Sequence, residues 1–425
     1  MSYKNILSGF FCYLFILPIC NKLKAQGQLK PCSIINLKGD TLTGFIEYYG
    51  WDNNPKKIKF RSTASSTETE YRPTEIREFH VNGEIYEAAI VQKETSPRSI
   101  NYITQTDALR IEKDTSFLLL LIKGSKSLYY CKPDGEEHSL YIKQNNNIEL
   151  LLYKKYSSII NGVTQIVERK DYITQLSEYL GDCSTVFGNI SNIRYSKDHL
   201  LSMFKNYYKC IGSNESYIKN KEPIKAKFGI AGGPQLTNPV FKSNSETYNE
   251  VESSVFNKPV SFTGAVFVDL ILPRTLTKWS IYNELAYSFY KVKGNLVTDQ
   301  QNPAGETAFM YRLHFGYIKL YNMVKYRRPV AQSAFYFKAG LSNGYMIQPV
   351  ENYKRKEQRY SMTIVTESDA IRSLKKYEIG AACSVGIQHK KLFGEIRYEL
   401  SNGAAHISDL KTKVHRISLL AGFSF

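Results

Sequence analysis

The residues best suited to catalysis in this sequence are His406 and Ser408, which lie two positions apart. A histidine can take the proton of a serine hydroxyl and make it a nucleophile when a rigid element holds both side chains. Here Gly403 is expected to open a loop that contains His406, so the pair is poorly placed and the alternative is a solvated histidine. The sequence contains no HExxH, GxSxG, Walker or GxGxxG motif. No catalytic residue and no cofactor is therefore expected.

A second group of polar residues alternates with apolar ones along the C-terminal half. The charged members are Asp269, Glu284, Lys338, Glu378, Glu395, Arg397 and Glu399. Charges on one face of an apolar strand need water or partners, and the lumen of a β-barrel provides both. They form either a gated polar pathway or a salt-bridged plug. The plug is favoured, because side chains fill eight-stranded barrels.

The chain is basic, with a formal charge of +17 and a pI of about 9.3. This balance fits contact with anionic lipid headgroups or a generally basic solvated surface. A basic run, Lys354, Arg355, Lys356 and Arg359, lies in the longest predicted outer loop. It is either solvated or in contact with lipopolysaccharide phosphates or a surface partner. No nucleic-acid motif is present, and no nucleic-acid partner is expected.

Residues 1–25 are typical of a secretory signal peptide. Lys4 supplies the positive charge, the stretch 6–19 is apolar but too short to span a membrane as a helix, and Ala25 is the expected cleavage position. Leu23 is larger than usual at its position, so the cut is not fixed. Lipoprotein processing at Cys20 is the alternative, and Ile19 disfavours it because that position is normally small.

Five cysteines follow the predicted cleavage: Cys32, Cys131, Cys183, Cys210 and Cys383. None belongs to a CxxC pair, so no metal site is expected. Export permits disulfides. Cys183 follows one predicted helix and Cys210 ends the next, so the two form a disulfide if the intervening loop folds back. The alternative is two small buried hydrophobic residues.

Residues 26–215 are predicted to form a β-rich domain closed by two short helices. The stretches 33–37 and 41–46 flank a turn, and Asn82-Gly83 is a strong hairpin signature. The apolar run 117–122 fits a strand buried on both faces. Tyr172 to Leu180 and Leu200 to Tyr208 show helical spacing, the second with Ser196 as N-cap. Residues 216–225 are interpreted as a linker.

Residues 226–425 are predicted to form an eight-stranded antiparallel transmembrane β-barrel. Eight segments carry apolar residues at every second position, a pattern that is weak in one segment and strong in repetition. They are 228–233, 262–270, 279–289, 309–326, 335–342, 377–388, 392–400 and 417–425. The alternation changes parity within 309–326, which suggests a bulge.

The predicted connections alternate between long and short along this half. The long ones are 235–260, 293–308, 348–375 and 401–413, and the short ones are 273–278, 327–333 and 389–391. Outer-membrane barrels have long outer loops and short periplasmic turns. This pattern places the N-terminal domain in the periplasm, and a soluble β-sandwich, the alternative, does not explain it.

Residues 226–425, about half of the chain, resemble the PorT-like outer-membrane β-barrels of Bacteroidota. The resemblance rests on Gly232-Gly233, Phe262-Thr263-Gly264, 284–287, 317–320, 339–341 and 420–425. It implies an outer-membrane location and a barrel architecture, and no particular reaction. It also implies that Phe423 and Phe425 act as the signal that the barrel-assembly machinery reads.

Three functions remain open after this reading. The first is a non-enzymatic outer-membrane barrel that anchors a periplasmic binding or assembly domain, with membrane lipid and a periplasmic or surface protein as partners. The second is an outer-membrane enzyme acting on lipid or lipopolysaccharide. Outer-membrane lipid A deacylases carry a His-x-Ser-Asn motif, whereas Asp409 follows Ser408 here. The third is a small-solute channel, which eight strands disfavour.

Overall fold

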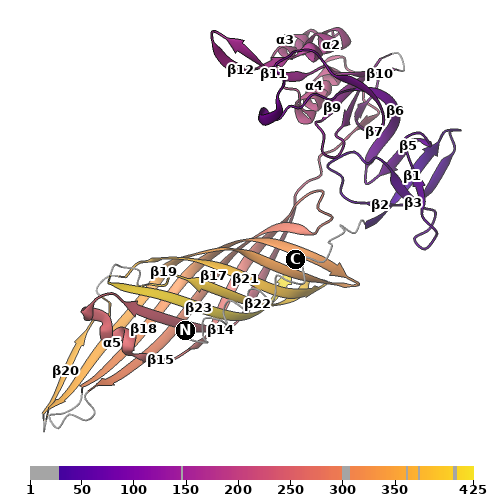
Figure 1. Ribbon diagram of the computed structural model, residues 1–425. Coiled ribbons are helices and arrows are strands. Elements are labelled where there is room, and N and C mark those ends of the chain that lie inside the picture. The colour runs from indigo at the N-terminus through magenta and orange to yellow at the C-terminus, as the bar shows by residue number, and fades with distance from the viewer. Residues whose placement is uncertain (1–27, 145–146, 299–306, 360–361, 372–373, 405–408) are drawn as a thin grey trace. The chain divides into compact units, whose positions relative to one another are not determined.

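The computed structural model describes residues 28–144, 147–298, 307–359, 362–371, 374–404 and 409–425. The predicted signal peptide lies outside these residues. The chain is mainly β, and it divides into a first unit that ends at Lys221 and a second unit, Glu222–Phe425 (Figure 1).

The first unit is built on one large antiparallel sheet. Its strands run in the order β10-β9-β8-β7-β6-β5-β1-β2-β3-β4, and β13 also pairs with β7. Their bounds are β1 Gln28–Asn36, β2 Thr41–Tyr48, β3 Ile58–Arg61, β4 Thr69–Tyr71, β5 Ile76–Val81, β6 Glu84–Glu94, β7 Ile111–Lys123, β8 Ser127–Cys131, β9 Ser139–Gln144, β10 Asn147–Leu150 and β13 Tyr217–Ile218. The run Phe117–Ile122 is entirely buried within β7, which confirms the prediction of a strand covered on both faces.

Asn-Gly pairs make two of the hairpins in this unit. Asn82 and Gly83 have φ of 53° and 74° and join β5 to β6, as predicted. Asn161 and Gly162, with φ of 51° and 76°, join β11 (Lys154–Ile160) to β12 (Val163–Arg169) in a separate two-stranded sheet. Both residues of a type I′ turn need positive φ, which asparagine and glycine tolerate. The second hairpin was not predicted.

Three helices follow these strands, where the sequence predicts two: α2 (Asp171–Tyr179), α3 (Ser184–Ile190) and α4 (Lys197–Cys210). Ser196 caps α4, since its side chain accepts a hydrogen bond from the His199 backbone N–H. The prediction of a loop at 184–195 is wrong for its first seven residues. The short, glycine-containing α3 has too little apolar periodicity to be recognised by spacing alone.

Part of the predicted linker, residues 216–225, is regular structure, and the division between the two units falls within it. Tyr217 and Ile218 form β13 and pair with Lys123 and Ile122 of β7. Lys219 is buried and forms an ion pair with Glu84. The predicted linker thus contains a short edge strand, followed directly by a lysine with a buried partner.

The second unit contains eight long strands that pair in sequence, which we call the strand ring. They are β14 (Lys225–Ser243), β16 (Val260–Ile271), β17 (Trp279–Thr298), β18 (Thr307–Val330), β19 (Ser333–Arg359), β21 (Tyr377–His389), β22 (Leu392–Ser401) and β23 (Leu410–Ser424). Each pairs antiparallel with its neighbours along the chain, and β14 also pairs with β23. The pairings therefore return to the strand where they began.

Several strands are longer than the alternation predicts. β14 continues to Ser243, and β17 and β18 pair as far as Thr298 and Thr307. The predicted outer loop 348–375 is mostly strand, because β19 runs on to Arg359 and pairs there with β20 (Met362–Ser368). Figure 1 shows these strands extending well past the others. Where two strands extend past the rest of the sheet, their backbone N–H and C=O groups still hydrogen-bond to each other. This pairing does not require an apolar face, so hydrophobic alternation does not reveal it.

The sequence predicted that the apolar residues change from one face to the other within 309–326 because of a bulge in this strand. The structure shows a different cause. β18 keeps one regular alternation, with Phe309, Tyr317 and Lys325 all on its buried side. A bulge is present, but the extra residue is Ile347 of β19, between the partners of Gly316 and Tyr317. The apolar residues change sides because the interior itself changes from polar to apolar along the strand.

Among the described residues, none of the helices has the length and apolar character needed to cross a membrane.

Candidate functional site

The interior of the strand ring holds a network of buried charges. Five acids and five bases lie there: Asp269, Glu284, Glu378, Glu395 and Glu399, with Lys319, Lys325, Lys338, Arg397 and Arg416. All point from alternate positions of their strands, and each takes part in an ion pair. The structure thus brings together all seven charged residues that the sequence singled out, and adds three bases.

One cluster is centred on Arg397 of β22. Its guanidinium donates to both carboxylate oxygens of Glu284, on β17, at 2.5 and 2.8 Å. Its Nε donates to Glu395 at 3.0 Å, and Lys338 Nζ lies 2.6 Å from the other Glu395 oxygen. Tyr282 donates its hydroxyl to Glu284 at 2.7 Å. The bidentate pair joins strands that are not neighbours, so the cluster ties across the interior.

A second cluster is centred on Arg416 of β23. Arg416 donates to both oxygens of Glu378, on β21, at 2.5 and 3.0 Å. Lys319 Nζ, on β18, lies 2.6 Å from Glu378 and 2.5 Å from Glu399. Tyr321 donates to the second oxygen of Glu399 at 2.8 Å. A smaller pair, Lys325 and Asp269 at 2.8 Å, completes the network.

Beyond Arg416 the interior becomes apolar and aromatic. The guanidinium lies 5.5 Å from the Tyr290 ring centre and 5.8 Å from that of Tyr317, a cation–π arrangement. A cluster of buried side chains follows: Phe241, Tyr248, Val251, Tyr290, Val292, Phe309, Tyr311, Leu313, Phe315, Tyr317, Met346, Ala370, Ile371, Ala404 and Leu410. Tyr248 and Val251 come from η3 (Glu246–Tyr248) and α5 (Asn249–Ser253), which follow β14.

Sequence reasoning missed Lys319, Lys325 and Arg416. Each alternates with exposed apolar residues, such as Ile318 and Leu320 beside Lys319, and Ile417 beside Arg416. This pattern is the one that identified the other seven. The two lysines were overlooked because the sequence reading assigned a change of parity to β18.

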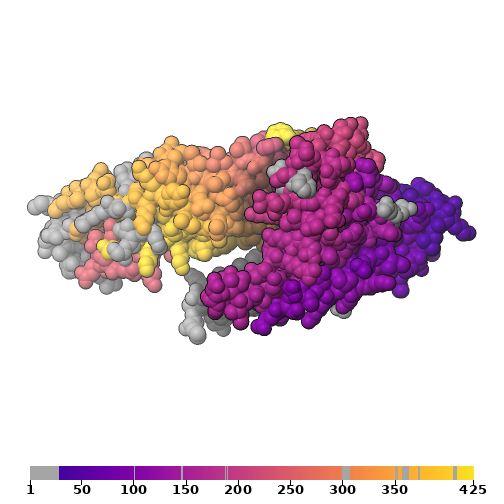
Figure 2. Space-filling view, turned by 90° about the horizontal axis from the view of Figure 1, so that it is seen from above, coloured from indigo at the N-terminus to yellow at the C-terminus, as the bar shows by residue number. Residues whose placement is uncertain are grey.

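The opposite face of the strand ring is apolar and exposed. At least two such side chains come from every strand of the ring: Phe228, Ile230, Phe262, Val266, Leu285, Tyr287, Ile318, Leu320, Val324, Phe335, Phe337, Leu341, Ile379, Val385, Ile387, Ile396, Tyr398, Leu400, Ile417 and Leu419. Side chains of these strands, pink through orange to yellow, form much of the surface of this unit seen in Figure 2. A water-soluble protein rarely exposes so large a continuous apolar surface.

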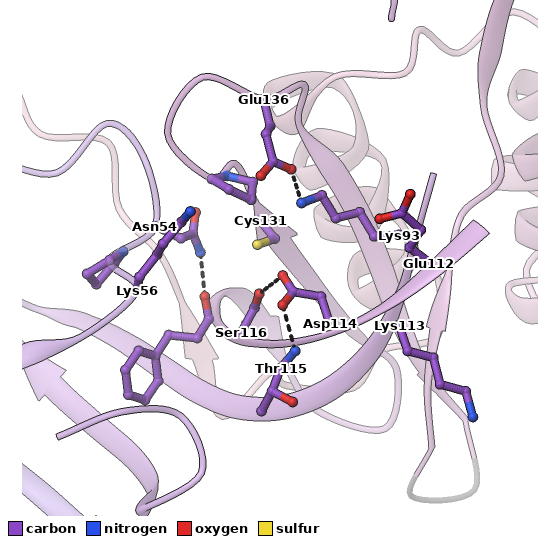
Figure 3. A pocket seen from close by; sticks show the side chains of 13 residues that line it. Asn54, Lys56, Lys93, Glu112, Lys113, Asp114, Thr115, Ser116, Cys131 and Glu136 are labelled. Atoms are coloured by element: carbon purple, nitrogen blue, oxygen red, sulfur yellow. Dashed lines mark hydrogen bonds and ion pairs between the residues drawn. The ribbon is translucent and has the colours of Figure 1, made fainter. Parts of the chain in front are cut away.

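The first unit has a polar pocket of about 290 Å³ (Figure 3). Three lysines, Lys56, Lys93 and Lys113, and three acids, Glu112, Asp114 and Glu136, lie around it. Lys93 pairs with Glu136, and Asp114 accepts hydrogen bonds from the Thr115 backbone N–H at 2.8 Å and from the Ser116 hydroxyl at 2.7 Å. Its charges are therefore balanced and partly satisfied internally.

Cys131 points its sulfur toward this pocket (Figure 3). Burial raises the pKa of its thiol to about 12, so the reactive thiolate is scarce at neutral pH. The pocket thus offers polar contacts for a ligand and lacks an activated nucleophile. Among the described residues, no group of three or more His, Cys, Asp or Glu is arranged to hold a metal ion.

The remaining predicted residues fall in three places. Cys183 and Cys210 form a disulfide with Cα atoms 6.2 Å apart, and Cys32, Cys131 and Cys383 are not disulfide-bonded. Phe423 lies opposite Ile230 of β14, and the Phe425 backbone N–H donates to the Phe228 carbonyl at 2.9 Å. His406 and Ser408 lie outside the described residues.

The basic run predicted in an outer loop lies instead on β19. Lys354 forms an ion pair with Glu367 of β20 at 2.8 Å, and Arg355 lies 5.7 Å from the Phe309 ring centre. The expectation of a loop is therefore corrected to a strand, and both side chains are exposed, as expected for a solvated run.

Comparison with known proteins gives likenesses of fold only. No family model and no curated protein matches the chain. Among solved structures, it is similar to Ail, the attachment invasion locus protein of Yersinia pestis, with 13% identity, a TM-score of 0.20, and coverage of 48% of this chain and 100% of that one. It is also similar to the outer membrane protein OprG from Pseudomonas aeruginosa, with 10% identity, a TM-score of 0.25, and coverage of 48% and 97%.

Neisserial surface protein A is a third similar structure, with 9% identity, a TM-score of 0.23, and coverage of 47% of this chain and 99% of that one. With TM-scores this low, none of the three supports an inference about this chain beyond its own geometry.

Proposed function

We propose that the strand ring is a closed eight-stranded β-barrel that resides in the outer membrane and anchors the first unit, a periplasmic domain with a binding or assembly role. One observation carries the proposal: the ring buries ten paired charges and exposes its apolar side chains. In water this arrangement would forfeit the hydrophobic effect. In a bilayer the apolar face contacts lipid, and a closed ring leaves no unpaired backbone edge.

The height of the exposed apolar surface supports this proposal. On β17 the outward side chains run from Trp279, 44% exposed, through Ile281, Leu285 and Tyr287 to Phe289. Ten residues span about 34 Å along a strand. At a tilt of about 40° this becomes roughly 25 Å, the height of the apolar band of outer-membrane barrels.

The direction of the strands supports a periplasmic first unit. The short connections 272–278, 331–332 and 390–391 lie at one end of the strand ring. Lys225, where the chain enters the ring, pairs with Ile271 at this same end. Short turns mark the periplasmic side of outer-membrane barrels. The chain preceding Lys225 would then lie in the periplasm.

The filled interior argues against a small-solute channel. Charge clusters tie strands together across one part of the interior, and aromatic side chains pack the next part. Solute passage would require breaking buried ion pairs. A salt-bridged plug is therefore our assignment for the lumenal charges.

The outer-membrane enzyme remains the less favoured function. Its only lead, His406 and Ser408, lies outside the described residues, and we propose a non-enzymatic role. The kinship with PorT-like proteins of Bacteroidota, the signal peptide at 1–25, and recognition of Phe423 and Phe425 by the barrel-assembly machinery rest on sequence patterns. They form part of the proposal and await tests.

Heat-modifiable gel mobility and cell fractionation test the proposal. The folded chain should migrate differently from the boiled chain and should leave the membrane only with detergent. Protease added to intact cells should spare the first unit, and it should cut this unit once the outer membrane is permeabilised. A chain that fractionates as a soluble protein would contradict the barrel. A first unit cleaved in intact cells would contradict only the periplasmic assignment.

The role of the first unit can be tested separately. Crosslinking in whole cells from a photoreactive residue at Lys113, on the rim of the polar pocket, should capture a discrete periplasmic partner. The same residue at Ile159, which is exposed on the β11–β12 hairpin and does not line the pocket, serves as the matched position. Equal capture from both positions would argue against the pocket as the binding surface.

A further inference from the structure

Two pairs of like charges face each other across neighbouring strands of the strand ring. Lys242 of β14 lies directly opposite Lys411 of β23, and Lys293 of β17 lies opposite Arg312 of β18. All four side chains are exposed on the outward face. Like charges placed directly opposite each other destabilise an antiparallel pair. Two such pairs at the same end of the ring therefore call for a compensating anion.

Ion pairs within the described residues do not supply that anion. No ion pair is formed there by the four facing cations, Lys242, Lys411, Lys293 and Arg312. The same holds for two further cations on the outward face, Lys291 and Lys413, which lie two residues from Lys293 and Lys411 along their strands. Every buried base of the network has a carboxylate within 4 Å, and even the exposed Lys354 pairs with Glu367. These six cations differ from those in forming no ion pair within the described residues, although the charge of Glu367 interacts electrostatically with Arg312.

Their place along the strands indicates where the anion comes from. On β17 the outward series Leu285, Tyr287 and Phe289 leads straight to Lys291 and Lys293. On β23 Leu419 and Ile417 lead, through His415, to Lys413 and Lys411. Residues two apart on one face are separated by about 6.7 Å. The cations thus begin where the apolar surface ends, at the depth of lipid headgroups.

We infer that these six residues, which we call the outer cation clusters, bind phosphate groups of outer-leaflet lipid. One cluster is Lys242, Lys411 and Lys413, and the other is Lys291, Lys293 and Arg312. A lipid is favoured over free phosphate because the adjoining apolar surface would hold its acyl chains while the cations hold its headgroup. The inference rests on the proposed membrane location. It adds that the outward surface selects lipids that carry phosphate groups.

The test measures binding of lipid A, a phosphorylated acylated sugar, to the full chain folded in uncharged detergent micelles. One variant carries Lys242→Gln, Lys411→Gln and Lys413→Gln, and the other carries Lys291→Gln, Lys293→Gln and Arg312→Gln. Each should weaken binding about tenfold, a change of about 1.4 kcal/mol. Added salt should weaken wild-type binding more than that of the variants.

The matched control is Lys225→Gln, Lys390→Gln and Lys391→Gln, which removes the same charge from exposed positions at the short-turn end. It should bind lipid A as the wild type does. Excess inorganic phosphate and phosphatidylcholine should both fail to displace lipid A. Equal loss in the control, wild-type binding by both variants, or displacement by inorganic phosphate would each overturn the inference.

Folding into phosphatidylcholine vesicles, followed by heat-modifiable mobility, separates this inference from the proposed function. That membrane has no net charge, so insertion does not need the outer cation clusters. If the wild type fails to insert, the barrel proposal fails. If all variants insert and bind lipid A alike, only the assignment of the clusters fails.

Discussion

Both units contain strands that alternate apolar and polar residues, and these strands bury opposite halves of the pattern. In β3 of the first unit, Ile58 and Phe60 are buried, while Lys59 and Arg61 are partly exposed. In the strand ring, Lys319, Glu378 and Arg416 are buried, while Leu320, Ile379 and Ile417 are exposed. A period of two identifies a strand in both units, but the surroundings decide which face turns inward.

This contrast changes what exposure means in each unit. An exposed isoleucine on the first unit meets water and contributes little to stability. An exposed leucine on the strand ring would meet lipid under the proposed function.

The largest effect is expected from Arg416→Met. It removes the bidentate partner of Glu378 and leaves Lys319 alone between two buried carboxylates. Breaking a buried ion pair from one side costs about 3–5 kcal/mol. Urea unfolding of the chain in vesicles, followed by gel mobility, measures the loss. Arg328→Met, at an exposed position, should cost little. Equal losses would show that the network contributes no particular stability.

The second prediction compares lysine substitutions in the two units. Leu285→Lys places a charge midway along the apolar face of β17, and a lysine at the bilayer midplane of a barrel costs about 2–4 kcal/mol. Ile90→Lys, at a position 74% exposed on the first unit, should change stability by less than about 0.5 kcal/mol. The same urea titration measures both. Indistinguishable costs would contradict the assignment of lipid to one face and water to the other.

The third prediction concerns the disulfide of the first unit. Replacing both Cys183 and Cys210 by alanine should destabilise this unit by about 2–4 kcal/mol, because the reduced unfolded chain gains freedom. Fluorescence of Trp51, which packs against Tyr48 and Tyr86, reports its unfolding in a Trp279→Phe background.

Each single cysteine variant should lose nearly as much stability as the double variant, because either one removes the whole bond. Cys383→Ala, in the strand ring, should leave the first unit unchanged. Additive losses from the two single variants would mean that the cysteines act as separate packing residues.

The smallest effect is expected from pH. His138 stacks between Tyr130 and Tyr195, and burial, followed by the charge of Arg98, lowers the pKa of its imidazole. The folded unit therefore favours neutral histidine. This contribution is complete above the unfolded-state pKa of about 6.5 and is lost as the pH falls below it.

His138→Phe should make the stability of the first unit less dependent on pH between about 7.5 and 5, by less than about 1 kcal/mol. His199→Ala, at an exposed position in the first turn of α4, is the control. The same Trp51 titration at several pH values measures the change. An unchanged pH dependence in His138→Phe would show that another group is responsible.

Local chemistry was sufficient to predict many elements of this protein. Asn82-Gly83 specified a turn because positive φ suits both residues, and Ser196 specified the start of α4 because its hydroxyl caps the helix. The alternation of apolar residues located parts of all eight strands of the ring. These features depend on residues within a few positions of one another, so they can be predicted from a single sequence.

Other features depend on residues that meet only after folding. Arg416 and Glu378 are 38 positions apart, and Arg397 and Glu284 are 113 apart. Charge alternation showed that such residues share a face, but the choice of partner depends on the register and pairing order of whole strands. The change from a charged to an aromatic interior also misled the reading of β18. A pattern of period two predicts which side chains of a strand share a face. It does not predict what that face contacts, because those neighbours are brought there only when the strands assemble into the ring.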